Sequence, residues 1–182
     1  MARQSYGRKK DDKRVLRRSG KPPTIHCMLI PAEKETLLLP TSVSMEVIDF
    51  TQPSPMEGAP PWLLGLLEWN NRQVPVFSFD ALINGSEVGK VDRRSKIMIL
   101  KSLADTGRVP YIGLLMEDLP RPVEIDDKDL SQTGDDKKSL GVFSRVTYEE
   151  TEAIIPDMDR LTHLVTHATF GALPITQLED GA

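Results

Sequence analysis

Short apolar runs, separated by turn-forming residues, follow one another along most of the chain. Residues 24–31, 34–40 and 42–50 are each short and apolar or alternating, and the first two segments end on proline. Runs of this length between turn residues predict β-strands. Four prolines and a glycine within residues 51–61 then predict a loop.

The most apolar part of the chain is split by a polar tripeptide. The runs 62–69 and 73–79 are separated by Asn70, Asn71 and Arg72. Asparagine tolerates positive φ, so the Asn-Asn pair predicts a tight two-residue turn between paired strands. The sequence therefore predicts a β-hairpin at this place.

Two details refine this hairpin and the segment that follows it. Pro75 cannot donate a backbone hydrogen bond, which predicts an edge strand or a bulge at its position. Residues 80–85 predict one helical turn, with Asp80 as the N-cap and Gly85 as the stop.

The second half of the chain continues the same alternation. Strands are predicted at 96–102, 109–117, 121–127 and 140–149, and residues 152–165 predict a strand that turns into a short helix. The charged residues 128–139 predict a loop, and residues 166–182 predict a C-terminal tail.

About nine or ten short strands without a long helix predict an all-β protein of the barrel or sandwich class. The segments 65–83 and 141–162 also resemble each other. Each runs from a glycine through an apolar strand, a polar turn, a second strand with proline and an acidic residue to a short helix. This similarity indicates two related subdomains.

Composition and charge narrow the class of protein. The 182 residues are 39% hydrophobic and 27% charged, which is typical of a soluble globular chain. No run approaches the roughly 18–20 apolar residues of a membrane span, and the charged N-terminus predicts no secretory signal. The single cysteine, Cys27, favours the reducing cytoplasm.

The first residues carry a strong local charge. Residues 1–21 hold nine Lys/Arg and two Asp, a net +7, whereas the remaining residues carry −11. With few apolar side chains, residues 1–23 are predicted to form a disordered basic arm. The arm suits an anionic lipid, nucleic acid or an acidic partner, or it serves only as a solubilising segment. A nucleic-acid-binding small barrel is therefore the alternative function, although the acidic remainder argues against it.

Candidate catalytic or metal-binding residues are few. His163 and His167 would share one face of a helix, but no third ligand of matching spacing follows. His26 and Cys27 are adjacent and would point to opposite faces of a strand, so a buried thiol is favoured over a catalytic pair. Phosphate-binding loops and nucleophile elbows are also missing from the sequence. We expect neither enzymatic activity nor a cofactor.

Two tryptophans flank the first apolar run of the hairpin. Trp62 and Trp69 fit core packing, and Trp69 also fits a partner-binding anchor, because interfaces favour tryptophan. An exposed apolar groove between the two subdomains is a further expectation for a protein that acts by binding.

The hairpin resembles the signature of the CheW-like domain family. The pattern is matched by Gly65, Leu66, Leu67, Trp69, Val74, Pro75, Val76 and Phe79. Residues 35–48 are similar to the upstream strand of the family, and residues 140–161 are similar to its second hairpin. The resemblance covers residues 24–165.

This resemblance implies both a fold and a function. The implied fold is two small five-stranded SH3-like β-barrel subdomains within residues 24–165, preceded by the arm 1–23 and followed by the tail 166–182. The implied function is that of a non-catalytic adaptor, which couples chemoreceptors to the regulatory domain of a histidine kinase. Such adaptors work in the cytoplasm at membrane-associated chemosensory arrays.

The chain departs from the family pattern at the turn. Glu68 replaces an Asn, Asn70 and Asn71 replace an Arg-Gly pair, Ser78 replaces an Asp and Asp80 replaces an Arg. These changes resemble those of accessory members in clusters that control type IV pili and twitching motility. The partner-binding residues implied by the resemblance are Glu68, Asn70, Asn71, Arg72, Val74, Pro75, Val76 and Asp80.

Overall fold

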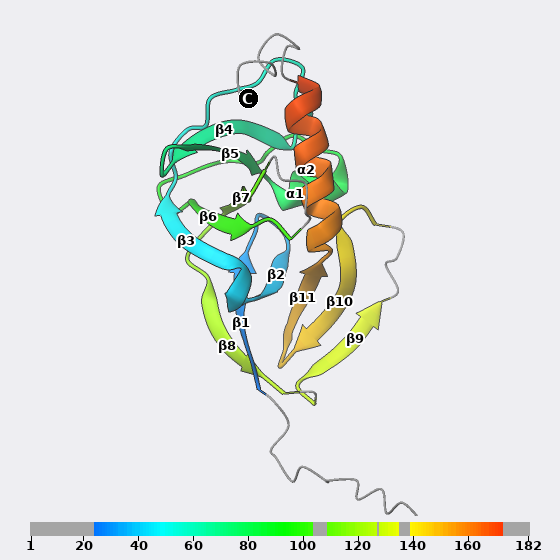
Figure 1. Ribbon diagram of the computed structural model, residues 1–182. Helices are drawn as coiled ribbons and strands as arrows, with labels where there is room; N and C mark the ends of the chain where they lie inside the picture. The colour runs from blue at the N-terminus through cyan, green and yellow to red at the C-terminus, as the bar shows by residue number, and fades with distance from the viewer. Residues whose placement is uncertain (1–23, 104–108, 127, 135–138, 173–182) are drawn as a thin grey trace, which may run out of the picture.

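A computed structural model describes residues 24–103, 109–126, 128–134 and 139–172 (Figure 1). The basic arm and residues 173–182 lie outside the described part, as does the expected turn at 105–107. Within the described residues the chain forms eleven strands, two α-helices and one 3-10 turn.

The elements follow the predicted order along the chain. The strands are β1 (Ile25–Pro31), β2 (Thr36–Pro40), β3 (Ser44–Asp49), β4 (Leu63–Trp69), β5 (Arg72–Phe77), β6 (Lys96–Lys101), β7 (Tyr111–Met116), β8 (Arg121–Ile125), β9 (Leu130–Gly134), β10 (Val142–Tyr148) and β11 (Thr151–Pro156). The helices are η1 (Thr41–Val43), α1 (Phe79–Asn84) and α2 (Met158–Ala172).

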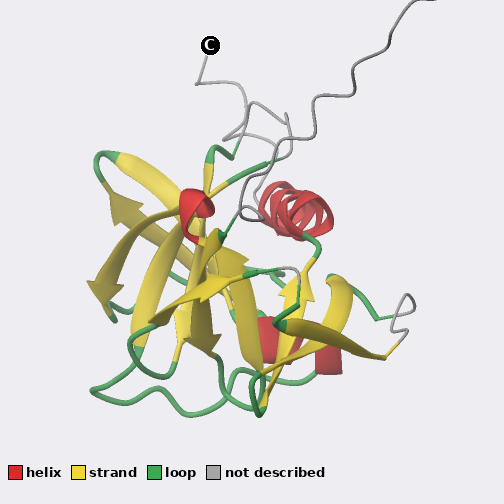
Figure 2. Cartoon of the chain, turned by 90° about the horizontal axis from the view of Figure 1, so that it is seen from below, coloured by secondary structure: helices red, strands yellow, loops and turns green. Residues whose placement is uncertain are grey.

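The strands form two sheets, which confirms the all-β class with two subdomains (Figure 2). The first sheet has the order β8-β1-β2-β11-β10-β9, and the second has the order β3-β6-β7-β5-β4. Each contains a hairpin followed by a helix, β4–β5 with α1 and β10–β11 with α2, as the internal similarity predicted. The second hairpin strand pairs in parallel with another strand in both sheets.

The first sheet has six strands because part of an expected loop is a strand. Residues 128–139 were predicted to be a loop, but β9 pairs antiparallel with β10. It is the outer strand of the sheet, and most of its side chains are exposed. An edge strand that buries little surface needs no apolar alternation, so the sequence pattern that marks a strand is missing here.

The helix α2 is longer than the short helix that the sequence predicts. It continues to Ala172, into the part that was assigned to the tail. Its buried face carries Thr162 and Thr169 in addition to apolar residues. Both hydroxyls donate to a carbonyl oxygen one turn back, on Met158 and Val165. These satisfied but polar residues interrupt the apolar period by which a helix is recognised.

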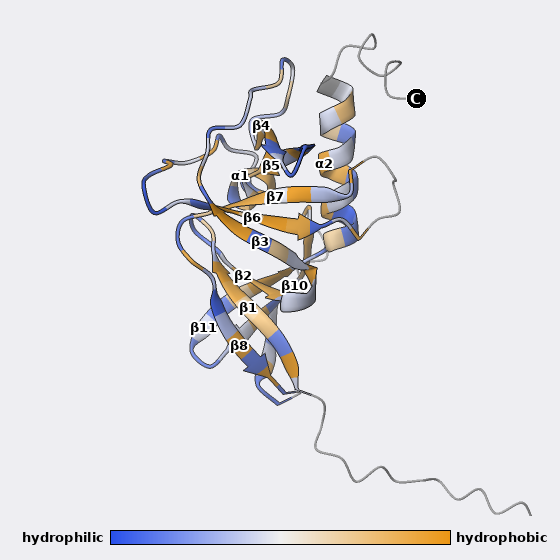
Figure 3. Cartoon of the chain, turned by 60° about the vertical axis from the view of Figure 1, so that its left-hand side comes forward, coloured by the Kyte–Doolittle hydropathy of each residue, from blue (hydrophilic) through white to orange (hydrophobic). Residues whose placement is uncertain are grey.

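A shared hydrophobic core joins the two sheets. It contains Ile30 and Leu39 from the first sheet, Phe77 and Leu114 from the second, and Leu161 from α2. Figure 3 shows the hydrophobic residues that run along β1, β6 and β7. A smaller core lies within each subdomain. Core side chains therefore fill the space between the two sheets themselves, where an exposed apolar groove was expected.

Pro75 was predicted to lie in an edge strand or at a bulge. The edge alternative is wrong, because β5 has β4 on one side and β7 on the other. A register shift does lie next to Pro75, where Val76 and Phe77 face Gly65 and Leu63. Pro75 pairs with Leu66, whose N–H and C=O both bond to Ser54 on the far side of β4. The pairing of β5 with β7 begins only at Val76, opposite Gly113. No neighbouring strand therefore requires an N–H from position 75.

Candidate partner-binding surface

The β4–β5 hairpin ends in the predicted two-residue turn. Asn70 and Asn71 have φ values of 48° and 58°, and Trp69 pairs with Arg72 across the turn. Positive φ at both central residues is the type I′ geometry, whose twist matches that of the paired strands. The Asn-Asn sequence therefore accounts for the turn.

The residues beside the turn form an aromatic cluster. The Trp69 indole N–H donates to a Glu46 carboxylate oxygen at 2.7 Å. The Trp69 and Tyr111 rings meet edge to face, with centroids 5.1 Å apart. The Arg72 guanidinium carbon lies 5.9 Å from the centre of the Tyr111 ring. This surface, which we call the hairpin tip, comprises Glu46, Glu68, Trp69, Asn70, Asn71, Arg72 and Tyr111.

The bond between Trp69 and Glu46 also shapes the second sheet. Glu46 is on β3 and Trp69 is on β4, the two outer strands of that sheet. Their contact brings the two edges together, so the sheet curls towards a closed barrel. The hairpin tip is thus fixed to the rest of the subdomain, which lowers the entropy lost when a partner binds.

The side chains of the tip offer several kinds of contact. Glu68, Asn70, Asn71 and Arg72 are exposed, and Trp69 is half-buried. Charged groups of both signs surround a partly exposed aromatic cluster, and amides supply donors and acceptors. Aromatic residues and arginine are enriched at protein interfaces. The tip therefore has the chemistry of a protein-binding surface.

Three of the predicted partner-binding residues do not reach this surface. Val74, Pro75 and Val76 are buried in β5. The two valines pack in the core of the second subdomain with side chains from β4 and β6. Their contribution is to hold the hairpin in place.

Asp80 is also buried, which contradicts its assignment as a surface contact and as an N-cap. The N-cap of α1 is Ser78, whose hydroxyl accepts from the Ala81 N–H at 3.3 Å. The Asp80 carboxylate instead accepts from the N–H groups of residues 33, 34 and 35, at 2.8, 3.1 and 3.2 Å. The loop between β1 and β2 is thereby tied to α1, so Asp80 links the two subdomains.

The environment of Asp80 shifts its titration. Burial raises the pKa of the Asp80 carboxyl, the N–H groups of Lys34 and Glu33 offset part of that rise, and the carboxylates of Glu35 and Glu33 add to it. The net pKa lies above its ordinary value.

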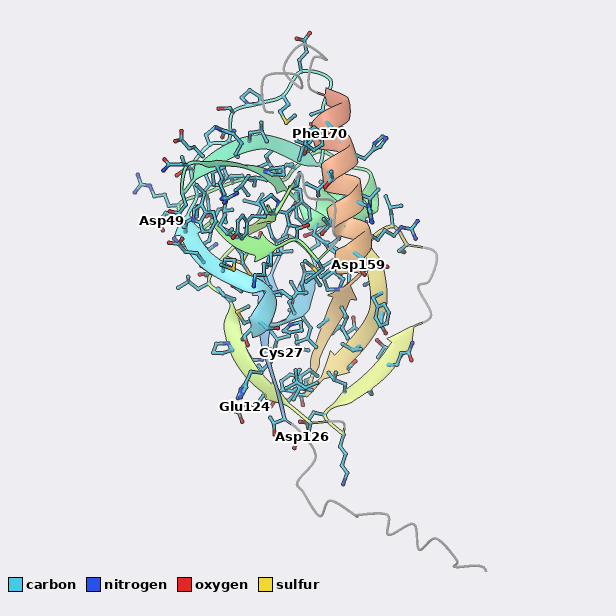
Figure 4. The ribbon with its side chains drawn as sticks, in the orientation of Figure 1. Cys27, Asp49, Glu124, Asp126, Asp159 and Phe170 are labelled. Atoms are coloured by element: carbon cyan, nitrogen blue, oxygen red, sulfur yellow. The ribbon has the colours of Figure 1, made fainter. Side chains whose placement is uncertain are left out.

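The remaining candidate residues are apart from the tip. Cys27 is buried, and burial raises the pKa of its thiol. His26 faces outwards and lies 3.6 Å from Glu124 (Figure 4 labels Cys27 and Glu124). His163 and His167 are exposed on α2. Among the described residues, no group of three His, Cys, Asp or Glu side chains could hold a metal ion.

Sequence reasoning did not find Glu46 and Tyr111 as parts of the tip. Glu46 is a single acid in a strand and Tyr111 begins another, and neither is near the turn in sequence. Trp69 was the one residue that could have pointed to them, because the indole N–H of a partly buried tryptophan usually has a hydrogen-bond partner.

The structure is similar to a solved protein structure of low sequence identity. The crystal structure of the scaffolding protein TtCheW from Thermoanaerobacter tengcongensis aligns with a TM-score of 0.61 at 16% sequence identity. The alignment covers 75% of this chain and 90% of the other. A search of curated proteins finds no match. In the described part, none of the helices is both long and apolar enough to cross a membrane.

The sequence itself matches a family description over most of its length. Residues 26–165 fit the family described as the CheW-like domain. This range includes both sheets, the hairpin tip and the first half of α2. The structural similarity to TtCheW, at 16% sequence identity, shows the same fold and agrees with this family match. The chain therefore belongs to the CheW-like domain family.

Proposed function

We propose that the protein is a non-catalytic adaptor that couples chemoreceptors to a histidine kinase in a chemotaxis-type signalling array. Family membership over residues 26–165 is the observation that carries this proposal. The name of the similar structure, a scaffolding protein, supports it. The partners are the regulatory domain of the kinase and the cytoplasmic tip of a chemoreceptor.

The mechanism follows from binding alone. An adaptor holds kinase and receptor at fixed positions, and the receptor state biases the kinase through the contacts that differ between its two states. The hairpin tip is the proposed contact surface on this chain. Its fixed turn and exposed side chains suit such a role, because a preorganised surface loses little entropy on binding.

The replaced residues at the turn suggest a specialised partner. Compared with the family pattern, Asn70 and Asn71 stand in place of an Arg-Gly pair, and Glu68 adds a negative charge. A change of charge alters which partner is accepted, through repulsion as well as attraction. We therefore assign the protein to an accessory array, such as one controlling type IV pili and twitching. A deletion strain should lose twitching and keep swimming; loss of swimming alone would contradict this assignment.

Binding measurements test the adaptor function and the tip separately. The protein is titrated against the kinase regulatory domain and against a receptor-tip fragment. Arg72→Glu and Glu68→Lys should each change the dissociation constant at least tenfold, about 1.4 kcal/mol. Asn70→Arg should strengthen binding by restoring the arginine of the family pattern.

A matched control lies at the other hairpin. Glu150→Lys reverses a charge at the exposed turn between β10 and β11 and should leave both affinities unchanged. If the unaltered protein binds neither partner, the adaptor function is wrong. If it binds and the tip variants bind equally well, the function stands and the contact surface lies elsewhere.

A further inference from the structure

A groove runs between the second half of α2 and the loop that joins β3 to β4. Pro60 and Trp62 line it on the loop side, and Leu164 and Ala168 line it on the helix side. All four residues are half-buried, and three of them pack against the shared core. Figures 1 and 3 show the loop beside the end of α2. The groove is thus an apolar extension of the core that remains open to solvent.

Two glycines line the groove where its space is open. A Cβ atom added at Gly58 or at Gly171 would meet no heavy atom within 4 Å. Gly58 belongs to the loop and Gly171 to the last turn of α2, and both line the groove. No described side chain therefore occupies the space above either glycine, and another segment of chain can enter there.

The sequence that follows α2 begins at the end of this groove. Residues 173–182 read LPITQLEDGA and start two positions after Gly171. Pro174 disfavours helical geometry at the residue before it, Leu173. The sequence therefore favours an end of the helix close to the groove.

The composition of residues 173–182 matches the groove. Leu173, Ile175 and Leu178 are apolar, as most of the lining is. The exposed His167 is the one ionisable residue among the described residues that line the groove. The groove extends along α2 from Gly171 back to Leu164, about 10 Å at 1.5 Å per residue. Three or four extended residues cover that distance at roughly 3.3 Å each. The segment is long enough to follow the whole groove.

The acidic residues of the segment can face a basic residue on α2. Glu179 and Asp180 follow the apolar part of the segment. Arg160 is exposed on α2, one turn before Leu164. A segment that runs back along α2 brings its acidic end towards this arginine after its apolar residues have passed the groove. Asp157 and Asp159 lie in the same turn as Arg160, so this orientation is favoured only by pairing with the Arg160 side chain itself.

We propose that residues 173–182 fold back along α2 and fill this groove. The apolar residues of the segment contact Trp62, Leu164 and Ala168, and its two carboxylates lie near Arg160. The protein thereby covers an apolar surface with its own C-terminus, and any other chain that uses this surface has to displace it. The inference does not depend on the adaptor function.

Paramagnetic broadening in the full-length protein tests this placement. Cys27→Ser removes the single cysteine, and Gln177→Cys then carries a nitroxide label. The label should broaden the amide signals of Leu164, Ala168 and Trp62 and leave Glu150, at the other hairpin turn, sharp. The double variant Ile175→Glu/Leu178→Glu should abolish the broadening. Thr176→Glu adds one of these charges while keeping the apolar residues and should preserve it.

Two further samples separate the alternatives. An isotope-labelled chain without nitroxide, mixed with spin-labelled unenriched chain, should show no broadening. Broadening in that mixture would mean that the C-terminus of a second copy fills the groove, which overturns the proposal. Uniformly sharp groove signals in the labelled chain would also overturn it. Truncation after Ala172, with Cys27 intact, should shift the same groove amides, so the result does not depend on the Cys27→Ser background.

Discussion

Asp80 connects two parts of the chain that are more than forty residues apart. Its carboxylate accepts three backbone N–H groups of the β1–β2 loop. Buried or partly buried N–H groups that lose their acceptor cost free energy, because water cannot replace the bond fully. The side chain therefore acts as a fixed link between the first sheet and α1.

Asp80→Ala is expected to lower the free energy of unfolding by about 2–3 kcal/mol, because three donors lose their acceptor. Urea denaturation followed by circular dichroism measures this difference. Asp118→Ala is the control. Asp118 is exposed and, among the described residues, accepts only from the next residue, Leu119, so its removal should change stability by less than about 0.5 kcal/mol. Equal stability of the Asp80 variant and the parent would exclude the proposed link.

The raised pKa of Asp80 predicts how stability depends on pH. Between the unfolded and the folded pKa, the folded state binds more protons at this group than the unfolded state. The contribution of Asp80 to stability is therefore largest below its unfolded pKa and falls as pH rises through the folded pKa. Relative to Asp80→Asn, the parent protein should lose stability across this interval. A difference that grows with pH would show that the hydrogen bonds outweigh burial.

The β4–β5 hairpin depends on a glycine at the start of β4. Gly65 has a φ of 134° and lies at the register shift between β4 and β5. A Cβ atom here would collide with the backbone carbonyl of Ser54, which pairs with Leu66. The hairpin and the preceding proline-rich loop can approach each other only because this side chain is missing.

Gly65→Ala is expected to lower the free energy of unfolding by at least about 2 kcal/mol, because a backbone collision adds to a φ that alanine avoids. Thermal and urea unfolding measure it. Gly85→Ala serves as the control, since its φ of 63° is also positive but its surroundings are open. That variant should lose only about 1 kcal/mol. Similar losses for both would show that the contact with Ser54 is unimportant.

Elements with a local cause were predictable from the sequence, and elements that depend on distant neighbours were not. The turn at Asn70–Asn71 follows from residues that adopt positive φ, so the hairpin was predicted. The edge strand β9 carries no apolar alternation. The buried face of α2 includes two threonines, which interrupt its apolar pattern in the sequence. The sequence predicted the residues of the candidate tip that lie in or next to the turn, from Glu68 to Arg72. It missed Glu46 and Tyr111, because these two join the tip through the curl of the sheet.

At the scale of the molecule, the shared core makes the two sheets interdependent. Side chains from both sheets and both α-helices belong to it. Neither subdomain can keep its inner face away from water if the other unfolds. The two subdomains should therefore unfold in one transition.

Leu37→Ala tests this cooperativity. Leu37 is on β2 in the first sheet and is 1% exposed in the shared core, so the variant should lose about 2–5 kcal/mol. Tryptophan fluorescence, from Trp62 beside β4 and Trp69 at its end, reports on the second sheet, and amide exchange of β11 reports on the first. Both signals should shift to the same lower denaturant concentration. If only the β11 signal shifts, the sheets unfold independently.

The order of the strands has a consequence for synthesis on the ribosome. The second sheet consists of β3 to β7, one uninterrupted stretch, whereas the first sheet combines β1 and β2 with β8 to β11. When Met116 has emerged, every strand of the second sheet is available, but β2 still lacks its neighbour β11. A nascent chain can therefore pair the strands of its central sheet early, but the core that both subdomains share is completed only when the last third of the protein has emerged. A ribosome that stalls before β11 would leave the β1–β2 hairpin with an exposed edge, the typical starting point of strand-mediated aggregation.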